Sequence, residues 1–330
     1  MRAPLFWHKS RRKLGFLSII LSPLAWAWHR GSVRRLANGP WEKLSVPVIC
    51  VGNINVGGTG KTPTVIALQS LLADRGIAAH IVSKGYGGTE IGPIKVIERD
   101  HSAAQMGDEP MLMAAFGPVW VSKDRALGAK AAIKDGAQAI LLDDGFQNPA
   151  LHQDLSIVVI DAEVGFGNGK VMPAGPLREN LITGLARANL IVSIGNSTAQ
   201  TSLTDTWPEI AGIERLNAHL APLQTGMDWK GLRAIAFAGI GRPGKFFNTL
   251  KDQGANIIAA HSFADHGTYS DAVLNRLKAE AQKSNAQLVT TEKDAARLPA
   301  SFRPNILTLP VRLKFGDQAS LTAILDRLFS

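Results

Sequence analysis

The sequence contains few of the residues that build several common kinds of site. Its one cysteine, Cys50, excludes an internal disulfide, and no Cys/His pattern typical of a zinc site is present. No internal repeat or low-complexity tract occurs, which excludes a repeat architecture. The apolar stretch 14–28 is too short to span a membrane comfortably, because a spanning helix needs about 20 residues. The single cysteine fits a protein of a reducing compartment.

Acidic residues are missing from the first 40 residues, and this absence explains most of the charge of the chain. The net charge of the whole chain is +9, and residues 41–330 contribute only +1 of it. The rest comes from basic residues near the N-terminus: Arg2, Lys9, Arg11, Arg12, Lys13, Arg30, Arg34 and Arg35. We therefore expect a basic arm rather than a basic domain, and no nucleic-acid partner.

The apolar stretch 14–28 lies between the basic clusters of this arm and ends in tryptophans. Basic flanks, an apolar helical face and tryptophans favour a segment that lies in the headgroup region of an anionic membrane. Two alternatives stay open. The segment could dock on its own domain, or it could be a cleaved signal, because Arg11-Arg12 and residues 25–27 resemble signal motifs.

Residues 47–65 contain the clearest functional motif, an apolar strand followed by a glycine-rich turn and the start of a helix. The N–H groups of such a turn and helix start bind phosphate. The motif places Lys61 at the β- and γ-phosphates and the Thr62 hydroxyl at Mg²⁺. Asn55 replaces the first glycine of the usual pattern, and we expect it to adopt the left-handed backbone that asparagine tolerates. The residues expected to bind a nucleoside triphosphate are Asn55, Val56, Gly57, Gly58, Thr59, Gly60, Lys61 and Thr62.

Asp143 and Asp144 follow the apolar strand 139–142, and this pattern predicts the second half of a nucleotide site. In such sites a carboxylate at the end of a buried strand holds Mg²⁺ or its water. Asp161, at the end of the strand 155–161, is the alternative candidate. The sequence therefore predicts Mg²⁺ together with the nucleotide.

Three further loops contain polar residues whose role the pattern leaves open. Asp108 precedes an apolar helical run, and its position favours a helix N-cap. Arg125 follows the strand 118–122 and suits either phosphate oxygens or a solvated helix start. Asp265 and His266 could form a proton relay, or a cap beside a surface histidine.

Strands alternate with helices over 45–195, which predicts an α/β fold of the P-loop type, with a mostly parallel sheet and helices on both faces. The alternation is lost over 196–230, and a second, shorter α/β pattern follows. We expect three parts: an N-terminal membrane-associated arm (1–40), a P-loop domain (41–225) and a smaller C-terminal α/β domain (226–330).

The smaller domain contains a literal G-x-G-x-x-G at 239–244. A dinucleotide site would need an acidic residue at the end of the next strand, which ends in Ala260-His261 instead. We interpret this motif mainly as tight packing of a helix on a strand. A last strand at 305–311 and a helix at 317–329 complete the expected domain. The alternative that this end of the chain packs back on the P-loop domain stays open.

An ordered set of motifs resembles the tetraacyldisaccharide 4'-kinase family. These motifs occur between residue 46 and about residue 297: VGNINVGGTGKTP, KGYGG, GDEP, SKDR, LLDDGFQ, DLSIVVIDA with GFGNG and MPAGPLRE, AGIGRPGKFF, FADH and TTEKD. The resemblance implies that the enzyme transfers the γ-phosphate of ATP to the 4'-hydroxyl of a lipid-linked disaccharide 1-phosphate, giving lipid IV(A). It also implies that 41–225 is the kinase domain and that 226–330 closes the active-site cleft.

The resemblance also implies roles for individual residues. ATP would contact the loop 55–62 together with Arg125 and Gln147, and Mg²⁺ would be held by Thr62, Glu109, Asp143 and Asp144. The catalytic set would be Lys61, Asp144, Asp108 as the base on the sugar hydroxyl, and His266, which is paired with Asp265 and orients that base. Two positions depart from the usual family pattern: Lys84 replaces an arginine, and Gly267 replaces a second histidine. Lysine lacks the planar fork of arginine, which weakens any bidentate contact at Lys84.

The implied location is the cytoplasmic face of the inner membrane of a Gram-negative bacterium, with the protein bound peripherally. A lipid with several acyl chains leaves a bilayer at a cost of about 0.8 kcal/mol per CH₂ group, so the enzyme must work at the interface. Two rival classes are a nucleotide-switch or partitioning ATPase, and a peripheral membrane-binding module with a degenerate site. The switch ATPases with a second loop lysine carry it at the position of Val56.

Overall fold

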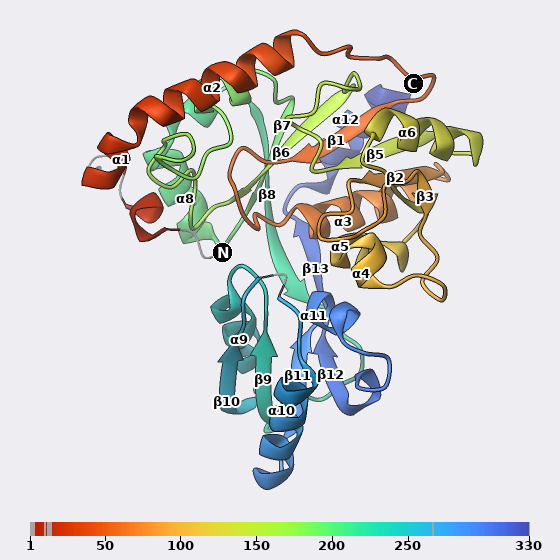
Figure 1. The fold of residues 1–330 in the computed structure, drawn as a ribbon, viewed down its shortest axis with the longest axis vertical. Coiled ribbons are helices and arrows are strands. Elements are labelled where there is room, and N and C mark those ends of the chain that lie inside the picture. Colours follow the sequence, from red (N-terminus) through yellow and green to blue (C-terminus); the bar gives the residue numbers. More distant parts are fainter. Residues whose placement is uncertain (1–3, 10, 12–14, 266, 330) are drawn as a thin grey trace.

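The computed structural model describes residues 4–9, 11, 15–265 and 267–329. Within these residues the chain forms two α/β units, each built on its own sheet, and an N-terminal arm on the larger unit (Figure 1). The predicted fold class, a mostly parallel P-loop-type sheet with a smaller α/β unit, is confirmed.

The larger sheet has nine strands among the described residues, in the order β13-β8-β7-β6-β1-β5-β2-β4-β3. Neighbouring strands are parallel except at the two edges, where β13 is antiparallel to β8 and β3 is antiparallel to β4. The strands are β1 (Val48–Gly52), β2 (Ala79–Ser83), β3 (Ile94–Lys95), β4 (Val119–Val121), β5 (Ala139–Asp143), β6 (Leu155–Asp161), β7 (Leu190–Ile194), β8 (Glu214–Pro222) and β13 (Val311–Phe315).

The central strands are apolar along their whole length because helices cover both faces of the sheet. Ile49 and Val51 of β1 pack into a cluster on one face, and Val48 and Cys50 pack into a cluster on the other. The first face is covered by α3 (Lys61–Ala73), α5 (Asp108–Ala114), which follows α4 (Ala103–Met106), and α12 (Gln318–Phe329); the second is covered by α6 (Arg125–Lys134), α7 (Leu181–Leu185) and α8 (Ser197–Thr206). This arrangement brings the carboxyl ends of the central strands β1, β5 and β6 together on one side of the sheet.

The smaller unit contains a four-stranded parallel sheet among the described residues, in the order β10-β9-β11-β12. One cluster holds α9 on this sheet through Phe246 and Leu250, and another holds α10 through Leu274 and Leu277. The elements are β9 (Arg233–Ala238), α9 (Pro243–Asp252), β10 (Asn256–Ser262), α10 (Asp271–Lys283), β11 (Gln287–Thr291), α11 (Glu292–Arg297) and β12 (Ile306–Leu309).

The chain passes between the units twice, and the two crossings contact each other. Residues 223–232 connect β8 to β9, and Pro310 alone separates β12 from β13. The backbone N–H of Leu223 donates a hydrogen bond to the carbonyl of Pro310 at 2.9 Å. The two covalent connections between the units therefore lie side by side.

The end of the chain packs differently from the sequence-based expectation that 226–330 forms one domain. The predicted strand 305–311 is divided at Pro310, and the residues after it return to the larger unit as β13 and α12. Leu313 and Leu321 are buried there in the core of the larger unit. A short apolar strand can cover the edge of either sheet, so its pattern alone does not indicate which sheet it joins.

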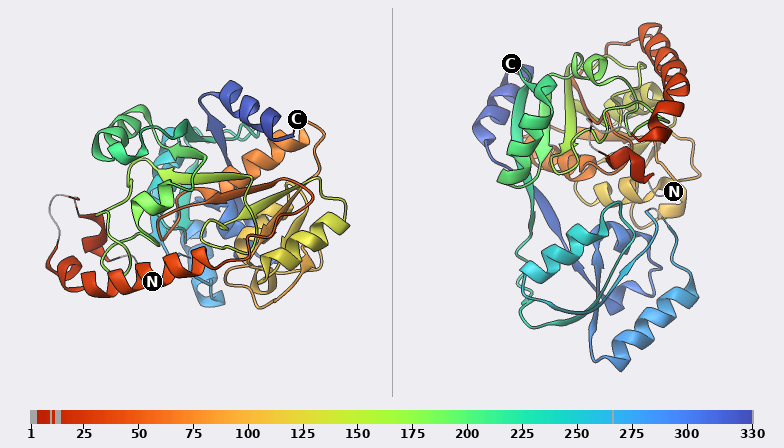
Figure 2. Two further views of the ribbon diagram at one scale, coloured as in Figure 1. Left: turned by 90° about the horizontal axis from the view of Figure 1, so that it is seen from above. Right: turned by 90° about the vertical axis from the view of Figure 1, so that its left-hand side faces the viewer.

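The N-terminal arm consists of η1 (Leu5–His8), α1 (Phe16–Ile20) and α2 (Ser22–Ala37), and it lies along the larger unit (Figure 2). Trp7 Nε1 donates to the carbonyl of Pro173 and Trp28 Nε1 to that of Arg178, each at 3.1 Å. The basic residues Arg2, Arg12 and Lys13 lie outside the described residues. Large apolar side chains of the arm remain exposed: Phe16, Leu17, Ile19, Ile20, Leu24, Trp26 and Trp28.

The described helices include none that is both long enough and apolar enough to cross a membrane. The arm therefore combines docking on its own domain with an uncovered apolar surface.

Candidate active site

The glycine-rich loop lies at the carboxyl end of β1 and leads directly into α3. Gly60 has a φ of 98°, a left-handed conformation that favours glycine, and a Cβ added there would have to displace the end of the Ile194 side chain, 2.4 Å away. The Asn53 amide donates to Thr59 Oγ1 at 3.0 Å and braces the loop from within. Lys61 and Thr62 are the first two residues of α3, as the motif predicts.

Asn55 supports the loop in another way than the sequence suggested. Its backbone is not left-handed. Its side chain is buried, and Nδ2 donates to the carbonyl of Gly165 at 2.9 Å. The expected left-handed conformation is therefore wrong, and Asn55 replaces glycine because its amide ties the loop to the segment after β6.

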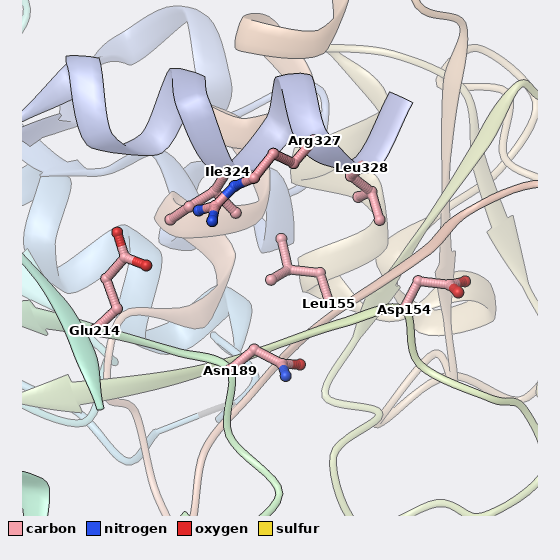
Figure 3. A pocket seen from close by; sticks show the side chains of 7 residues that line it. All are labelled: Asp154, Leu155, Asn189, Glu214, Ile324, Arg327 and Leu328. Carbon is pink, nitrogen blue, oxygen red and sulfur yellow. The ribbon is translucent and has the colours of Figure 1, made fainter. Parts of the chain in front are cut away.

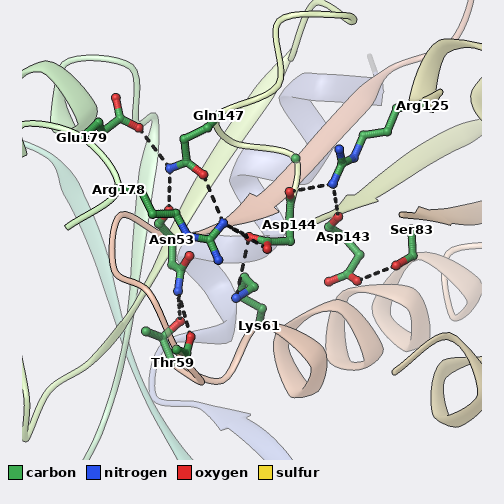
Figure 4. A network of polar contacts seen from close by, with 12 residues as sticks. Asn53, Thr59, Lys61, Ser83, Arg125, Asp143, Asp144, Gln147, Arg178 and Glu179 are labelled. Carbon is green, nitrogen blue, oxygen red and sulfur yellow. Dashed lines mark hydrogen bonds and ion pairs between the residues drawn. The ribbon is translucent and has the colours of Figure 1, made fainter. Parts of the chain in front are cut away.

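Asp143 and Asp144 lie at the mouth of this loop, where β5 ends beside β1 (Figure 4). Lys61 Nζ lies 3.7 Å from Asp144 Oδ1. Arg178 Nη1 donates to both carboxylate oxygens of Asp144, at 2.9 and 3.0 Å. Asp143 Oδ2 accepts instead from Ser83 Oγ at 2.9 Å. Two adjacent acids thus have different partners.

The two acids also differ in proton affinity. Burial, together with the charges of Glu109 and Asp144, raises the pKa of Asp143 to about 7. Burial alone would raise the pKa of Asp144 as well, but Lys61 and Arg178 outweigh it and hold that pKa below its usual range. Asp144 is therefore a carboxylate at neutral pH, whereas Asp143 is partly protonated, because burial and the neighbouring acids outweigh the charge of Lys61.

The residues at this place fit Mg²⁺. Asp143 Oδ1 is buried and has no hydrogen-bond partner among the described residues, which leaves an acceptor that a cation would satisfy. The described part of the chain has no group of three or more His, Cys, Asp or Glu side chains placed to hold a metal ion. Mg²⁺ commonly uses only one or two carboxylates, with phosphates and waters completing its shell. Thr62, buried at the start of α3, would add its hydroxyl.

Gln147 and Arg125 hold the loops around the acids. Gln147 Nε2 donates to the carbonyl of Asn53 at 2.7 Å and to Glu179 Oε1 at 3.0 Å. Arg125 is buried, and its Nη2 donates to the carbonyl of Asp144 at 2.8 Å. In this state both residues bind protein backbone, and their predicted contacts with ATP stay predictions.

Asp108 lies where the two units meet. It is the first residue of α5 and follows the N-cap position, which Gly107 occupies, so the N-cap interpretation is wrong. Its side chain is 5% exposed. Two cations of α11, which belongs to the smaller unit, approach it: Lys293 Nζ lies 3.8 Å and Arg297 Nε 3.7 Å from Asp108 Oδ2. Lys293 Nζ also lies 3.0 Å from Glu109 Oε1.

The loop of Asp265 approaches the glycine-rich loop through Gly241. A Cβ added at Gly241 would lie 3.5 Å from Asp265 Oδ2 and 3.9 Å from the backbone nitrogen of Gly58. Its neighbour His266 lies outside the described residues, so its predicted role as the partner of Asp108 stays a prediction. Gly241 thus connects the two loops that the sequence placed at the site.

Asp161, the alternative candidate for the metal-binding acid, is bound by cations instead. Its Oδ2 accepts from Arg242 Nη1 at 2.7 Å and lies 3.0 Å from Lys245 Nζ. Both cations belong to the G-x-G-x-x-G segment and the start of α9. This segment does join β9 to α9, as the packing interpretation expects, but it also fastens the smaller unit to the larger one.

A pocket near the C-terminus lies away from this site (Figure 3). It is found at the amino ends of parallel strands, whereas the glycine-rich loop follows the carboxyl end of β1. Its lining residues are Asp154, Leu155, Asn189, Glu214, Ile324, Arg327 and Leu328. Asp154 accepts from the backbone N–H of Val48 at 2.9 Å, a contact that supports the fold.

Reasoning from the sequence missed the roles of four cations at the site: Arg178, Arg242, Lys293 and Arg297. A signal was present for three of them, because Arg178, Arg242 and Lys293 lie in motifs that the sequence analysis quoted without a role for these residues. Arg297 lies three positions after the last quoted motif. The acids that these four cations approach between the loops and units, Asp144, Asp161, Glu109 and Asp108, are 34 or more positions away in sequence, so no local pattern could pair them. Arg297 also pairs with Asp294, three positions away.

Comparisons with known proteins agree with this geometry. A family model described as tetraacyldisaccharide-1-P 4'-kinase matches residues 17–330. A protein named tetraacyldisaccharide 4'-kinase from Dinoroseobacter shibae is 57% identical, with 100% of this chain and 98% of that protein covered. One of the same name from a Jannaschia species is 51% identical, with 99% of each covered.

A solved structure is also similar. It is the "apo" form of LpxK from Aquifex aeolicus in complex with ATP, 28% identical to this chain, with a TM-score of 0.74. The match covers 96% of this chain and all of that one.

Proposed function

The chain belongs to the tetraacyldisaccharide 4'-kinase family, and on that basis we propose which of its residues carry out the reaction and where. It is an ATP-dependent phosphotransferase that acts on a hydroxyl group in the lipid A 4'-kinase step. The γ-phosphate passes from ATP to the 4'-hydroxyl of a tetraacyldisaccharide 1-phosphate, and lipid IV(A) is the product. The observation that supports the assignment of residues is the placement of Lys61 opposite Asp144, at the carboxyl ends of adjacent strands.

ATP is bound with its phosphates in the loop 55–62. The loop N–H groups and the start of α3 carry partial positive charge, and Lys61 adds a full charge beside the β- and γ-phosphates. In the structure Lys61 and Arg178 share the carboxylate of Asp144, so both cations are already held at the mouth of the loop. Preorganised charge of this kind is a large part of catalysis in phosphoryl transfer.

Asp143, Asp144 and Thr62 would hold Mg²⁺, and Glu109 lies near enough to raise the pKa of Asp143. When bound, the ion would neutralise charge on the phosphates. The contribution of the chain is to keep the oxygens of Asp143 buried and oriented, through Ser83, and to keep Asp144 ionised.

Asp108 accepts the proton of the 4'-hydroxyl. The hydroxyl oxygen forms the new bond to the γ-phosphorus, the bond from that phosphorus to the β–γ bridging oxygen breaks, and ADP leaves. The site suits a base because Asp108 is nearly buried between the units, with Lys293 and Arg297 beside its carboxylate. His266, with Asp265 beside it in the sequence, would orient this base.

The arm binds an anionic membrane surface at the cytoplasmic face of the inner membrane, and the protein is peripheral. The exposed apolar side chains of α1 and α2 support this proposal, as do Arg30, Arg34 and Arg35 on α2. Trp28 links the arm to the backbone of Arg178, which itself binds Asp144. Binding of the arm to lipid would therefore place the site beside the headgroup of the acceptor.

Transfer of labelled γ-phosphate to a tetraacyldisaccharide 1-phosphate in micelles tests the proposal. We expect Asp108→Asn to lower kcat by about 10²- to 10⁴-fold, because general base catalysis is worth that much. Asp74→Asn, at the exposed C-cap of α3, is the matched control and should leave kcat unchanged. Full activity of Asp108→Asn would refute the role of Asp108.

His266→Gln in the same assay tests the orienting role of His266. Hydrolysis of ATP without label in the lipid, together with dimerisation that depends on nucleotide, would favour the rival switch ATPase.

A further inference from the structure

Helix α11 of the smaller unit carries two cations to the acid pair that begins α5 of the larger unit. Lys293 Nζ lies 3.0 Å from Glu109 Oε1, and Arg297 Nε lies 3.7 Å from Asp108 Oδ2. Burial alone would lower the pKa of Lys293, but the charges of Glu109 and Asp108 outweigh it and raise that pKa. In Figure 1, α11 lies next to α5 at the junction of the two units. Two acids thus meet two cations across this junction.

Arg297 is fixed within the smaller unit by the other two nitrogens of its guanidinium group. Nη1 donates to the carbonyl of Gly267 at 3.1 Å, and Nη2 donates to the carbonyl of Gly239 at 2.7 Å. Nη2 also pairs with Asp294, and the guanidinium lies over the ring of Tyr269. The side chain is 8% exposed. Its position is therefore determined by the loops around it.

The third nitrogen, Nε, is buried and makes no hydrogen bond to any described residue. It is the donor that lies 3.7 Å from Asp108 Oδ2. An N–H···O hydrogen bond needs about 2.7–3.2 Å, so a shift of roughly half an ångström between the units would form one. A buried donor left unpaired is destabilising, which favours such a shift.

We propose that Arg297 is a positioning residue, which fixes the carboxylate of Asp108 against the smaller unit and brings the base into its working position as the two units close. This inference rests on the proposed role of Asp108 as the base. The planar guanidinium suits the task because it can hold two carbonyls and a carboxylate at fixed angles. Asp108 and the loop that precedes Tyr269 then move as one body, since Arg297 also binds the carbonyl of Gly267.

Variants of Arg297 separate positioning from simple stability. We expect Arg297→Met to lower kcat about 10²-fold, the size of loss that a misplaced catalytic group produces, while the KM for ATP changes little. Arg297→Lys keeps the charge and should lose most of the same activity, because it lacks the fork. In Arg297→Ala, millimolar guanidinium chloride should restore part of kcat, and an equal concentration of sodium chloride should not.

Tyr269→Phe is the matched control. It removes the hydrogen bond of 2.7 Å from Tyr269 to Asp294 in the same network but leaves Asp108 and its approach to Arg297 unchanged. We expect a lower unfolding temperature and an unaltered kcat. A loss of kcat in Tyr269→Phe equal to that in Arg297→Met would show that the network acts only through stability, and would overturn the inference.

A double variant tests whether Arg297 acts through Asp108. If it does, adding Arg297→Met to Asp108→Asn costs little further activity; losses that multiply would refute the inference. If the Arg297 variants keep a normal kcat while Asp108→Asn is inactive, the inference about Arg297 is refuted and the role of Asp108 stands. An active Asp108→Asn would refute the proposed function itself. If Arg297→Met fails to fold, the kcat of Arg297→Lys and the rescue of Arg297→Ala by guanidinium chloride test the inference instead.

Discussion

Arg242 of the smaller unit donates a hydrogen bond to Asp161 of the larger unit, with 2.7 Å between Nη1 and Oδ2. Arg242 also pairs with Glu163, and Lys245 lies 3.0 Å from Asp161. The start of α9 therefore forms a second charged junction between the units, in addition to the one between α11 and α5. Gly241, which precedes Arg242, lies next to Gly58 of the glycine-rich loop, so we expect this junction to influence how the smaller unit approaches bound ATP.

The first prediction concerns this junction. Arg242→Gln should lower kcat/KM for the lipid about twofold to fivefold, since a partly exposed ion pair contributes up to about 1 kcal/mol. Asp161→Asn removes the ion pairs with both Arg242 and Lys245, so it should lower kcat/KM for the lipid at least as much. Glu163→Gln, at the more exposed acid, is the control and should have the smallest effect. Steady-state kinetics at low and high salt check this, because added salt should reduce the difference between wild type and Arg242→Gln.

If the double variant Arg242→Gln/Asp161→Asn loses the product of the two single losses, the two side chains act independently and this ion pair does not matter for closure.

A second prediction concerns Lys61. Lys61→Ala should reduce kcat about 10²- to 10³-fold, because it removes one preorganised charge from the transferred phosphate. The unfolding temperature should change little, since Arg178 still neutralises Asp144. Lys130→Ala, at an exposed lysine of α6 paired with Glu42, controls for the loss of a positive charge. A Lys61→Ala variant that keeps kcat and loses only affinity for ATP would contradict the proposed contact with the γ-phosphate.

The sequence predicted those parts of the site that a continuous segment builds. A strand, a glycine turn and a lysine follow one another in 48–61, and Asp143 and Asp144 directly end a buried strand, so the local pattern contains their geometry. The conformation predicted for Asn55 was wrong because asparagine is needed there for a tertiary contact, the hydrogen bond from its side chain to the carbonyl of Gly165. Asp108 looked like an N-cap because the two cations that approach it come from a helix more than 180 residues later.

The fold shows the same limit. Alternation of strands and helices predicted the mostly parallel sheet of the larger unit and the α/β class of the smaller one. The sequence did not show that Pro310 separates two strands of different sheets. Which sheet the second strand joins depends on which sheet has an edge strand free to pair with it.

A third prediction concerns pH and magnesium. The pKa of Asp143 is about 7 in the folded, metal-free protein and about 3.9 in an unfolded chain, so the folded state binds this proton more tightly. The stability from this group is complete below about pH 4 and is lost as the pH rises through about 7. Asp143→Asn removes the titration, and its unfolding temperature with EDTA should therefore fall less between these pH values.

Magnesium should reverse this trend, since it competes with the proton for the same oxygens. We expect the rise in unfolding temperature caused by Mg²⁺ to be larger near pH 8 than near pH 6, and to be nearly absent in Asp143→Asn. An equal rise at both pH values in the wild type would show that Asp143 does not hold the ion.

A fourth prediction concerns Cys50. Burial within β1 raises the pKa of its thiol to about 12, so at neutral pH it is protonated and enclosed. A thiol reagent such as Ellman's reagent should not react with the native protein, and one equivalent should react after unfolding in guanidinium chloride. Reaction of the native protein at neutral pH would show that β1 is not buried as described.

The last prediction concerns the apolar surface of the arm. Phe16 on α1 is 76% exposed, and burying such a side chain in lipid contributes about 1.5–3 kcal/mol. Phe16→Glu should therefore lower binding to anionic vesicles at least tenfold and raise the KM for lipid in vesicles, while kcat in detergent micelles stays normal. Leu127→Glu is the matched control, because Leu127 is also exposed but lies on α6, outside the arm. If Phe16→Glu and Leu127→Glu bind vesicles as tightly as the wild type, the exposed face of the arm does not contact the membrane, and the docking of Trp7 and Trp28 on the larger unit is its main purpose.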